Sequence, residues 1–270
     1  MPSMTWAPDS HEGFCDGAGS RELPWALVDE FSSSMPASYR VLFDPRTIRQ
    51  HGSIVSRRGV QTAHAEVWRV LPDRSAAICV VAEDRPGLLS AIAAALVSHR
   101  LDVITALVFS RAHPAGDPVE AVDLLWVRRA NPSDHARIDN DEATSIVAIL
   151  TAILEGRISV EDIASCAVHD AVNPKAPTSV RFDEVDEDGR AVLIVEAPDR
   201  NGMLLTIALH VFQQGAQIVH SLVRTVGQRA YNRFQLVDLN GQALPSERRT
   251  QICSAVQAAL ALGPSECPLE

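Results

Sequence analysis

The hydrophobic pattern of the chain predicts short buried strands that alternate with amphipathic helices. Ile78–Ala82 is a continuous apolar run that ends in a polar turn, which is typical of a buried strand. Apolar residues over 88–99 then recur at helical spacing, so one face of a helix packs inward. Val103–Phe109 and Asp123–Val127 have the character of strands again, and Ile146–Ile153 marks a second helix. One unit is therefore strand, helix, strand, strand, helix.

The same order of elements occurs twice. Ala76–Ser110 aligns with Ala191–Thr225 at an offset of 115 residues (191 − 76). Farther along, the alignment sets Leu124 against Phe234, at an offset of 110 (234 − 124). The loop before this strand is therefore expected to be five residues shorter (115 − 110) in the second unit. A loop that shortens while both flanks are retained is typical of duplicated domains.

Each unit has one more strand candidate in front of it. These candidates are Ala65–Val70 and Ser179–Asp183, and each is followed by a polar turn. A hairpin would place this strand antiparallel to the first core strand, where the fourth strand of a ferredoxin-like unit lies. The residues after Leu262 are too few and too rich in proline for a further strand. We predict an α+β fold of two permuted ferredoxin-like ββαββα units, with antiparallel sheets and helices on one face.

The predicted organisation divides the chain into six segments. They are a flexible N-terminal segment (1–35), a connecting arm (36–60), the first unit (61–157), a linker (158–178), the second unit (179–262) and a tail (263–270). Trp25–Phe31 is a candidate short helix within the first segment, and a small helix is expected over Ile158–Ala167 in the linker.

Composition and charge narrow the classes of partner. The chain has 24 basic and 34 acidic residues and a net charge of −10, which disfavours nucleic acid and anionic lipid. Its longest mostly apolar stretch, Leu88–Val97, is about half the length that a membrane-spanning helix needs. The first residues lack the apolar centre of a secretory signal, and no two of the five cysteines have C-x-x-C spacing. We therefore expect a cytoplasmic protein with no nucleic-acid or membrane partner, no metal and no cofactor.

Catalytic motifs are missing from the sequence as well. It has no H-E-x-x-H, G-x-S-x-G or Walker sequence, and its His169–Asp170 pair lies in the predicted linker without further ligand candidates. We expect a protein that is not an enzyme and has no catalytic residues.

The chemistry of the chain concentrates in two equivalent turns, Asp84–Leu88 and Asp199–Met203, each at the start of a predicted helix. A helix N-terminus offers unpaired N–H groups and a partial positive charge, which suit a carboxylate. Glycine, at Gly87 and Gly202, lets a ligand approach the backbone because it has no Cβ. An aspartate beside the same turn can hold an ammonium group. These parts together suit a small ligand that carries a carboxylate and an ammonium group.

The two turns also carry a family resemblance. EDRPGLLSAIAAAL and APDRNGMLLTIALHV resemble the opening of ACT domains, which are small amino-acid-sensing modules of metabolic regulation. The segments Arg40–His51, Glu155–Asp162 and SVRFDEV…VEAPDR resemble the C-terminal half of bifunctional PII uridylyltransferase/uridylyl-removing enzymes, in which a connecting segment precedes tandem ACT domains. The resemblance covers about Arg40 to Leu262 and implies two ACT domains.

In ACT domains with ligand, the pocket lies between two units and is bounded by this turn and by the second strand of a neighbour. Carried onto this sequence, the resemblance implies the following ligand-binding residues: Asp84, Arg85, Pro86, Gly87, Leu88, Leu89, Thr105, Asp199, Arg200, Asn201, Gly202, Met203, Leu204 and His220.

Each group of these residues has a simpler interpretation. Asp84 and Asp199 are equally well explained as helix caps. The two glycines would also let a helix lie close to the sheet, and the arginines and His220 would also be explained by exposure to solvent. Asn201 departs from the proline at the equivalent Pro86, so the second turn is expected to bind differently, or only one of the two sites to work.

The function that follows is a non-enzymatic regulatory sensor, built of tandem ACT domains and linked to nitrogen or amino-acid metabolism. The ligand is a small amino acid, glutamine by family analogy, and a partner enzyme receives the signal. The alternatives are a ligand-free interaction or dimerisation module and a uridylyltransferase-related regulatory fragment. Pairing of edge strands within one chain or in a homodimer is left open.

Overall fold

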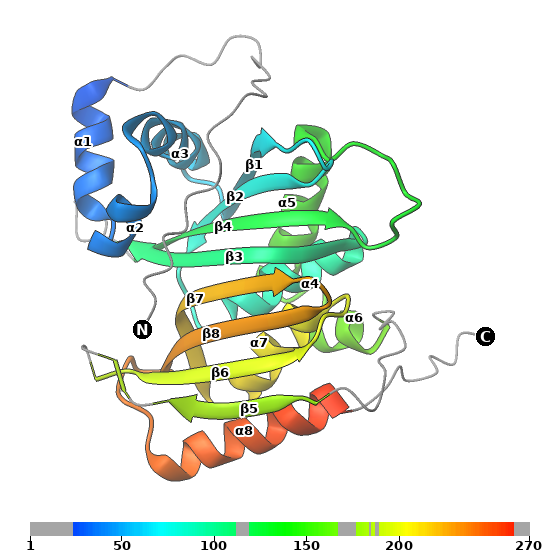
Figure 1. Ribbon diagram of the computed structural model, residues 1–270. Helices are drawn as coiled ribbons and strands as arrows, with labels where there is room; N and C mark the ends of the chain where they lie inside the picture. Colours follow the sequence, from blue (N-terminus) through cyan, green and yellow to red (C-terminus); the bar gives the residue numbers. More distant parts are fainter. Residues whose placement is uncertain (1–23, 112–118, 167–176, 184, 187–188, 262–270) are drawn as a thin grey trace.

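The computed structural model describes residues 24–111, 119–166, 177–183, 185–186 and 189–261. In these residues the strands form one eight-stranded antiparallel sheet, in the order β1-β2-β4-β3-β7-β8-β6-β5 (Figure 1). The strands are β1 (Ala63–Val70), β2 (Ala76–Glu83), β3 (Leu101–Arg111), β4 (Glu120–Arg129), β5 (Ser179–Asp183), β6 (Ala191–Pro198), β7 (Ala216–Val226) and β8 (Arg229–Asp238).

Four helices cover one face of this sheet. The first unit contributes α4 (Leu88–Ser98) and α5 (Asn140–Leu154), and the second contributes α7 (Met203–Gln213) and α8 (Ser246–Ala261). A shorter helix, α6 (Val160–Cys166), follows α5 and contacts both α4 and α7. A continuous hydrophobic core fills the space between these helices and the sheet. Burial of this apolar area is the main force that fixes the layers.

The predicted fold is confirmed in its topology. β1 pairs antiparallel with β2, with Ala65 opposite Val80, and β5 pairs with β6 in the same way, with Val180 opposite Val195. The extra strand thus takes the place of the fourth strand in each unit. Both units are permuted ferredoxin-like ββαββα units.

The two units join edge to edge within the chain. β3 and β7 pair antiparallel, from Thr105 opposite Arg224 to Val108 opposite Ser221. Helices α4 and α7 lie side by side beneath this seam (Figure 1). One edge of each unit is therefore paired within the chain, β1 and β5 form the outer edges of the sheet, and the turns before α4 and α7 both come to the junction between the units.

A second helical layer covers the opposite face of the first unit, which the sequence did not lead us to expect. It consists of α1 (Trp25–Ser34), α2 (Ala37–Leu42) and α3 (Pro45–Arg58), and it lies on the far side of β1–β4 from α4 and α5 (Figure 1). The physical reason lies in the strands, because Val81 and Leu124 point to this face and are fully buried. Strands that are apolar on both faces need cover on both.

This layer contains a buried polar pair. The hydroxyl of Tyr39 lies 2.8 Å from Nδ1 of His51, and neither residue is exposed to solvent. Burial lowers the pKa of His51 to about 3 and raises the pKa of Tyr39. Both side chains are therefore neutral at physiological pH.

The strand register corrects one part of the repeat alignment. In the first unit Ile78 pairs with Leu125, and the equivalent Leu193 pairs with Phe234. Phe234 therefore corresponds to Leu125, at an offset of 109 (234 − 125), and not to Leu124. A shift of one residue moves a side chain to the other face of a sheet, and Leu124 indeed packs against the arm helices. The second loop is six residues shorter (115 − 109).

The predicted segments compare with the observed helices as follows. The arm expected at 36–60 holds α2 and α3, and the linker expected at 158–178 holds α6. The candidate helix at Trp25–Phe31 is confirmed as α1, which extends to Ser34. Residues 1–23 lie outside the described part of the chain, as do 167–176 and the tail at 263–270. None of the helices in the described ranges has the length and apolar character needed to cross a membrane.

Candidate ligand-binding site

Each of the two turns ends in a glycine with left-handed backbone. Gly87 (φ 83°) and Gly202 (φ 74°) are the N-cap residues of α4 and α7, and neither helix start has a side-chain cap. The interpretation of Asp84 and Asp199 as helix caps is therefore wrong. The helices begin only after the glycine, too far along the chain for these carboxylates to cap them. Asp84 instead accepts a hydrogen bond from the Ser110 hydroxyl at 2.5 Å.

The arginines of the two turns bind helix C-termini. Arg85 donates to the carbonyl of Leu154 at the end of α5, and Arg200 donates to the carbonyl of Ala259 near the end of α8, both at 3.2 Å. A cation at the carbonyl end of a helix is stabilised by the helix dipole and satisfies an otherwise unpaired acceptor. Both arginines thus hold the second helix of their unit in place.

The corner next to Gly87 is closed. It lies between the Asp84–Leu88 turn and the start of β7, and its cavity has a volume of about 20 Å³. The Phe212 side chain of α7 fills it, with ring atoms 3.3 Å from where a Cβ on Gly87 would stand. Such a volume holds about one water molecule, since one needs roughly 10–15 Å³. The predicted site residues that line it are Asp84, Arg85, Gly87, Leu88 and Leu89.

Two carboxyl groups face this closed corner. Asp123 is fully buried, and burial together with the nearby charge of Asp84 raises its pKa well above the usual value. Burial also raises the pKa of Asp84, although the hydrogen bond from Ser110 lowers it in part. At the position equivalent to Asp123 the second unit has Asn232, which is also buried and donates to the sulfur of Met203.

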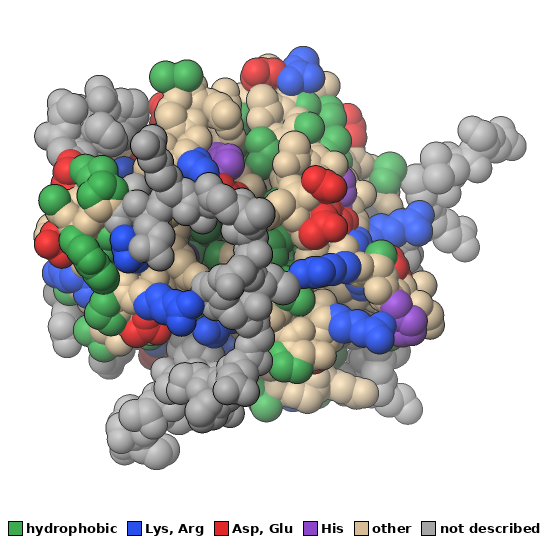
Figure 2. Space-filling model, turned by 90° about the horizontal axis from the view of Figure 1, so that it is seen from above, with side chains coloured by type: hydrophobic (Ala, Val, Ile, Leu, Met, Phe, Trp, Pro, Cys, Tyr) green, Lys and Arg blue, Asp and Glu red, His purple; other side chains and the backbone are tan. Residues whose placement is uncertain are grey.

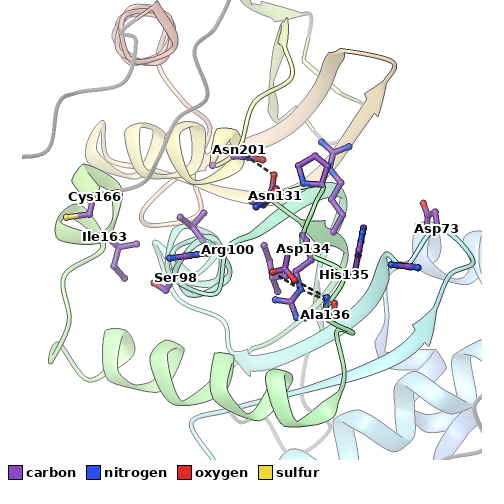
Figure 3. Close-up of a pocket in the computed structure, with 18 residues that line it drawn as sticks. Asp73, Ser98, Arg100, Asn131, Asp134, His135, Ala136, Ile163, Cys166 and Asn201 are labelled. Atoms are coloured by element: carbon purple, nitrogen blue, oxygen red, sulfur yellow. Dashed lines mark hydrogen bonds and ion pairs between the residues drawn. The ribbon is translucent and has the colours of Figure 1, made fainter.

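The corner next to Gly202 opens into a large cavity, of about 1400 Å³. It is lined by the turn between β1 and β2, the end of α4, the end of β4 with the loop after it, α6 and the turn before α7, and Asn201 and Gly202 lie on its wall (Figure 3). The residue equivalent to Phe212 is Val97 (212 − 115), which also lines this cavity. The smaller valine leaves open the space that phenylalanine fills at the other corner.

A charge cluster of two aspartates with low exposure and an exposed arginine joins the two units beside this cavity. Arg128 donates to Asp102 at 2.7 Å and to Asp199 at 2.9 Å, so it ties the first unit to the turn of the second. Burial is the main cause that raises the pKa of Asp102 to about 6. The positive charge of Arg128 lowers this pKa, and the negative charge of Asp199 raises it further. Above that pH two carboxylates face one guanidinium, so the cluster carries an excess negative charge that suits an ammonium group.

The structure does not bring Thr105 and His220 to either corner. A β-bulge separates Val103 from Thr105, and an equivalent one separates Ile218 from His220. Each bulge inserts a residue and so turns the next side chain to the other face of the sheet. His220 accordingly lies against Phe109, at 5.7 Å between ring centroids, on the side of the arm helices.

The remaining predicted residues lie in the core, at the surface and on the wall of the open cavity. Met203 and Leu204 are buried in the core under the second unit, and Pro86 is exposed and lines neither cavity. Asn201 lines the open cavity, and its amide donates to the carbonyl of Ala130 at 3.4 Å.

Comparison with known proteins places this geometry in context. No family model matches the chain. It is 25% identical to the "Bifunctional uridylyltransferase/uridylyl-removing enzyme" of Gluconobacter oxydans over 261 residues, which are 91% of this chain and 26% of that enzyme. The enzymes of the same name from Xanthomonas campestris pv. campestris and Phenylobacterium zucineum are also 25% identical, over 87% and 89% of this chain and 26% and 25% of theirs.

The resemblance expected from the sequence is thus confirmed. The chain is similar to about a quarter of each of these enzymes. Among solved structures, EtuB from Clostridium kluyveri is 13% identical, covers 73% of this chain and 85% of its own, and has a TM-score of 0.23. A likeness at that score bears on neither fold nor function.

Sequence reasoning missed Phe212, Arg128 and Asp102. The repeat contains a signal for the first, because the offset of 115 sets Phe212 against Val97 and so contrasts a large and a small side chain beside the same kind of turn. For Asp102 and Arg128 no such signal exists, since the second unit has Gln217 and Val237 at the equivalent positions.

Proposed function

We propose that this chain is a non-enzymatic regulatory protein of nitrogen or amino-acid metabolism, which binds a small amino acid in the cavity beside Gly202. The observation that carries the proposal is the contrast between the two corners. The turn at Gly202 lines a cavity of about 1400 Å³, and the equivalent turn at Gly87 lines a cavity of about 20 Å³. Similarity to a part of uridylyltransferase/uridylyl-removing enzymes supports a regulatory role. Glutamine is the first candidate ligand by family analogy.

The chemistry of the cavity suits a zwitterion. The start of α7 has no side-chain cap, so its amide groups and helix dipole attract a carboxylate. The Asp102–Arg128–Asp199 cluster, with its excess of carboxylate, attracts the ammonium group. A ligand held in this way contacts the turn of one unit and the strands of the other. It would stabilise one arrangement of the two units, and this population shift is the signal.

The partner is a protein that recognises this arrangement, and we expect no nucleic acid. On the face seen from above, basic and acidic side chains of the described residues are interspersed (Figure 2). A nucleic-acid surface would show a basic stripe instead. A homodimer would have to use surfaces other than β3 and β7, because these strands pair with each other. We place the protein in the cytoplasm, with the enzymes that it would regulate.

The closed corner beside Gly87 is the observation that favours a second candidate function, that of an interaction module without ligand. With Phe212 in place of a ligand, the Gly87 corner has the form of a pocket turned into packing. If the Gly202 cavity were equally inactive, the chain would be an interaction module. Light scattering and partner capture with and without amino acids separate these functions.

Isothermal titration calorimetry tests the proposal. We expect one of the common amino acids, with glutamine tried first, to bind with a stoichiometry of about one per chain. The matched variant is Val97→Phe, which copies the Phe212 side chain into the open cavity. It should fold with an unchanged thermal midpoint and lose binding. An absence of heat with every amino acid at millimolar concentration would overturn the proposal, and labelling of PII protein above background would contradict the non-enzymatic part.

A further inference from the structure

Two arginines of the first unit have unusual backbone conformations. Among the described residues, the non-glycine residues with positive φ are Arg74 (φ 68°) and Arg100 (φ 54°). An L-residue in this region is strained by contact between its Cβ and the backbone, so glycine is the ordinary occupant. Arg74 lies in the turn between β1 and β2, and Arg100 follows the C-terminus of α4.

The second unit has glycine at both equivalent positions. At the offset of 115, Arg74 corresponds to Gly189 (φ 76°) and Arg100 to Gly215 (φ 71°). The hydrogen bonds also correspond: the amides of Arg100 and Gly215 each donate at 2.8 Å, to Val97 and Phe212 respectively. The fold thus requires left-handed backbone at these points in both units, and the first unit places an arginine there.

Both side chains line the cavity beside Gly202 and are exposed. In the described part of the chain neither guanidinium has a hydrogen-bond or ion-pair partner. The other two arginines of the cavity are already paired, Arg128 with two aspartates and Arg129 with Glu142. The backbone of Arg100 adjoins the site directly, because its carbonyl accepts from the amide of Ala130.

The acidic residues on the cavity wall form no ion pair with Arg74 or Arg100 among the described residues. Asp73 accepts hydrogen bonds from Ser75, and Asp134 accepts from the amide of Ala136 and lies 3.9 Å from Arg129. Figure 3 shows Asp73 at one end of the cavity and Cys166 and Ile163 at the other, with Arg100 between them. Arg74 and Arg100 therefore line one cavity, whose volume of about 1400 Å³ has room for more than one small group.

We propose that the cavity takes up an anionic small molecule, carboxylate- or phosphate-bearing, whose negative groups are bound by Arg74 and Arg100. The planar guanidinium matches both kinds of oxyanion with two parallel hydrogen bonds. The inference rests on the cavity of the proposed function and names its ligand class. If the ligand is an amino acid, it is one with an acidic side chain, which adds a second negative group.

Calorimetry at low ionic strength with L-glutamate, L-glutamine and inorganic pyrophosphate tests this assignment. We expect glutamate or pyrophosphate to bind at least about tenfold more tightly than glutamine, and added salt to weaken that binding. Tighter binding of glutamate would identify a carboxylate ligand, and tighter binding of pyrophosphate would identify a phosphate ligand. Equal affinity for glutamine and both anions would overturn the assignment and leave the amino-acid function standing. Binding of no probe would overturn the assignment as well, and the amino-acid function would fall only if every other common amino acid also failed to bind.

Variants that copy the second unit test the two arginines. Arg74→Gly and Arg100→Gly should each weaken binding of the anion about tenfold. Their thermal midpoints should equal or exceed that of the wild type, because glycine fits the left-handed backbone. Arg100→Gln should also weaken binding, but without the gain in stability. Arg181→Gln on the distant edge strand β5 removes the same charge and should change nothing. Unchanged affinity in both glycine variants would overturn the proposal.

Discussion

The ring of Phe212 lies 3.3 Å from the point that a Cβ atom on Gly87 would occupy. One residue of the second unit thus closes the corner that glycine leaves open in the first. At the other corner the equivalent Val97 is too short to do so, and a cavity of about 1400 Å³ remains. The duplicated turns share the D-R-x-G sequence and the left-handed glycine, and the side chain at the end of the neighbouring helix decides which of them is accessible.

Exchange of this side chain should make the two corners alike. We predict that Phe212→Val opens the Gly87 corner and raises the stoichiometry of amino-acid binding from about one to about two per chain. The loss of half-buried ring contacts should lower the free energy of unfolding by about 1–3 kcal/mol. Calorimetry and urea unfolding measure the two effects. A stoichiometry that stays at one, in a variant that folds, would show that the ring is not what closes this corner.

Asp123→Asn should stabilise the protein at pH 7. Asp123 is buried with a raised pKa, so the folded state binds more protons than the unfolded state between the unfolded and folded pKa values. Stability therefore falls as the pH rises through this interval, and each unit of the shift costs about 1.4 kcal/mol at higher pH. Asparagine, which the second unit uses at this position, has no such cost.

Urea unfolding at pH 7 and pH 4 provides the measurement for this variant. The advantage of Asp123→Asn over the wild type should be largest at pH 7 and shrink toward pH 4. A variant less stable than the wild type at pH 7 would mean that the carboxylate has a stabilising partner there.

His51 makes the stability of the protein depend on pH in the opposite direction to Asp123. Burial lowers its folded pKa to about 3, so the folded state binds fewer protons than the unfolded state between that value and the ordinary 6.5. Stability therefore falls as the pH drops through this window. Relative to a His51→Phe variant, the wild type should lose about 2 kcal/mol between pH 7 and pH 5. Exposed His135, changed to Gln, serves as the control. Parallel losses in wild type and His51→Phe would place the protonation elsewhere.

The sequence predicted the topology because the topology depends on signals that are visible in it. The repeat of D-R-x-G turns and the front strands Ala65–Val70 and Ser179–Asp183 sufficed to predict two permuted units. Apart from the candidate helix at Trp25–Phe31, the layer of α1–α3 was missed, although the run from Ala76 to Ala82 is apolar at every position, which indicates a strand covered on both faces.

The site was predicted only in part, for two physical reasons. The bulges before Thr105 and His220 each shift the alternation of a strand by one residue, and a bulge leaves no mark in side-chain type. The contrast between Phe212 and Val97 acts across the junction of two units, so it gains meaning only once β3 and β7 are known to pair.

A crystal structure of the chain soaked with saturating amino acid tests the central claim most directly. We predict electron density for one ligand in the cavity beside Gly202, with its carboxylate toward the start of α7, and an unchanged Phe212 ring at the Gly87 corner. Density at the Gly87 corner with Phe212 displaced, or two empty corners at saturating ligand, would contradict the account.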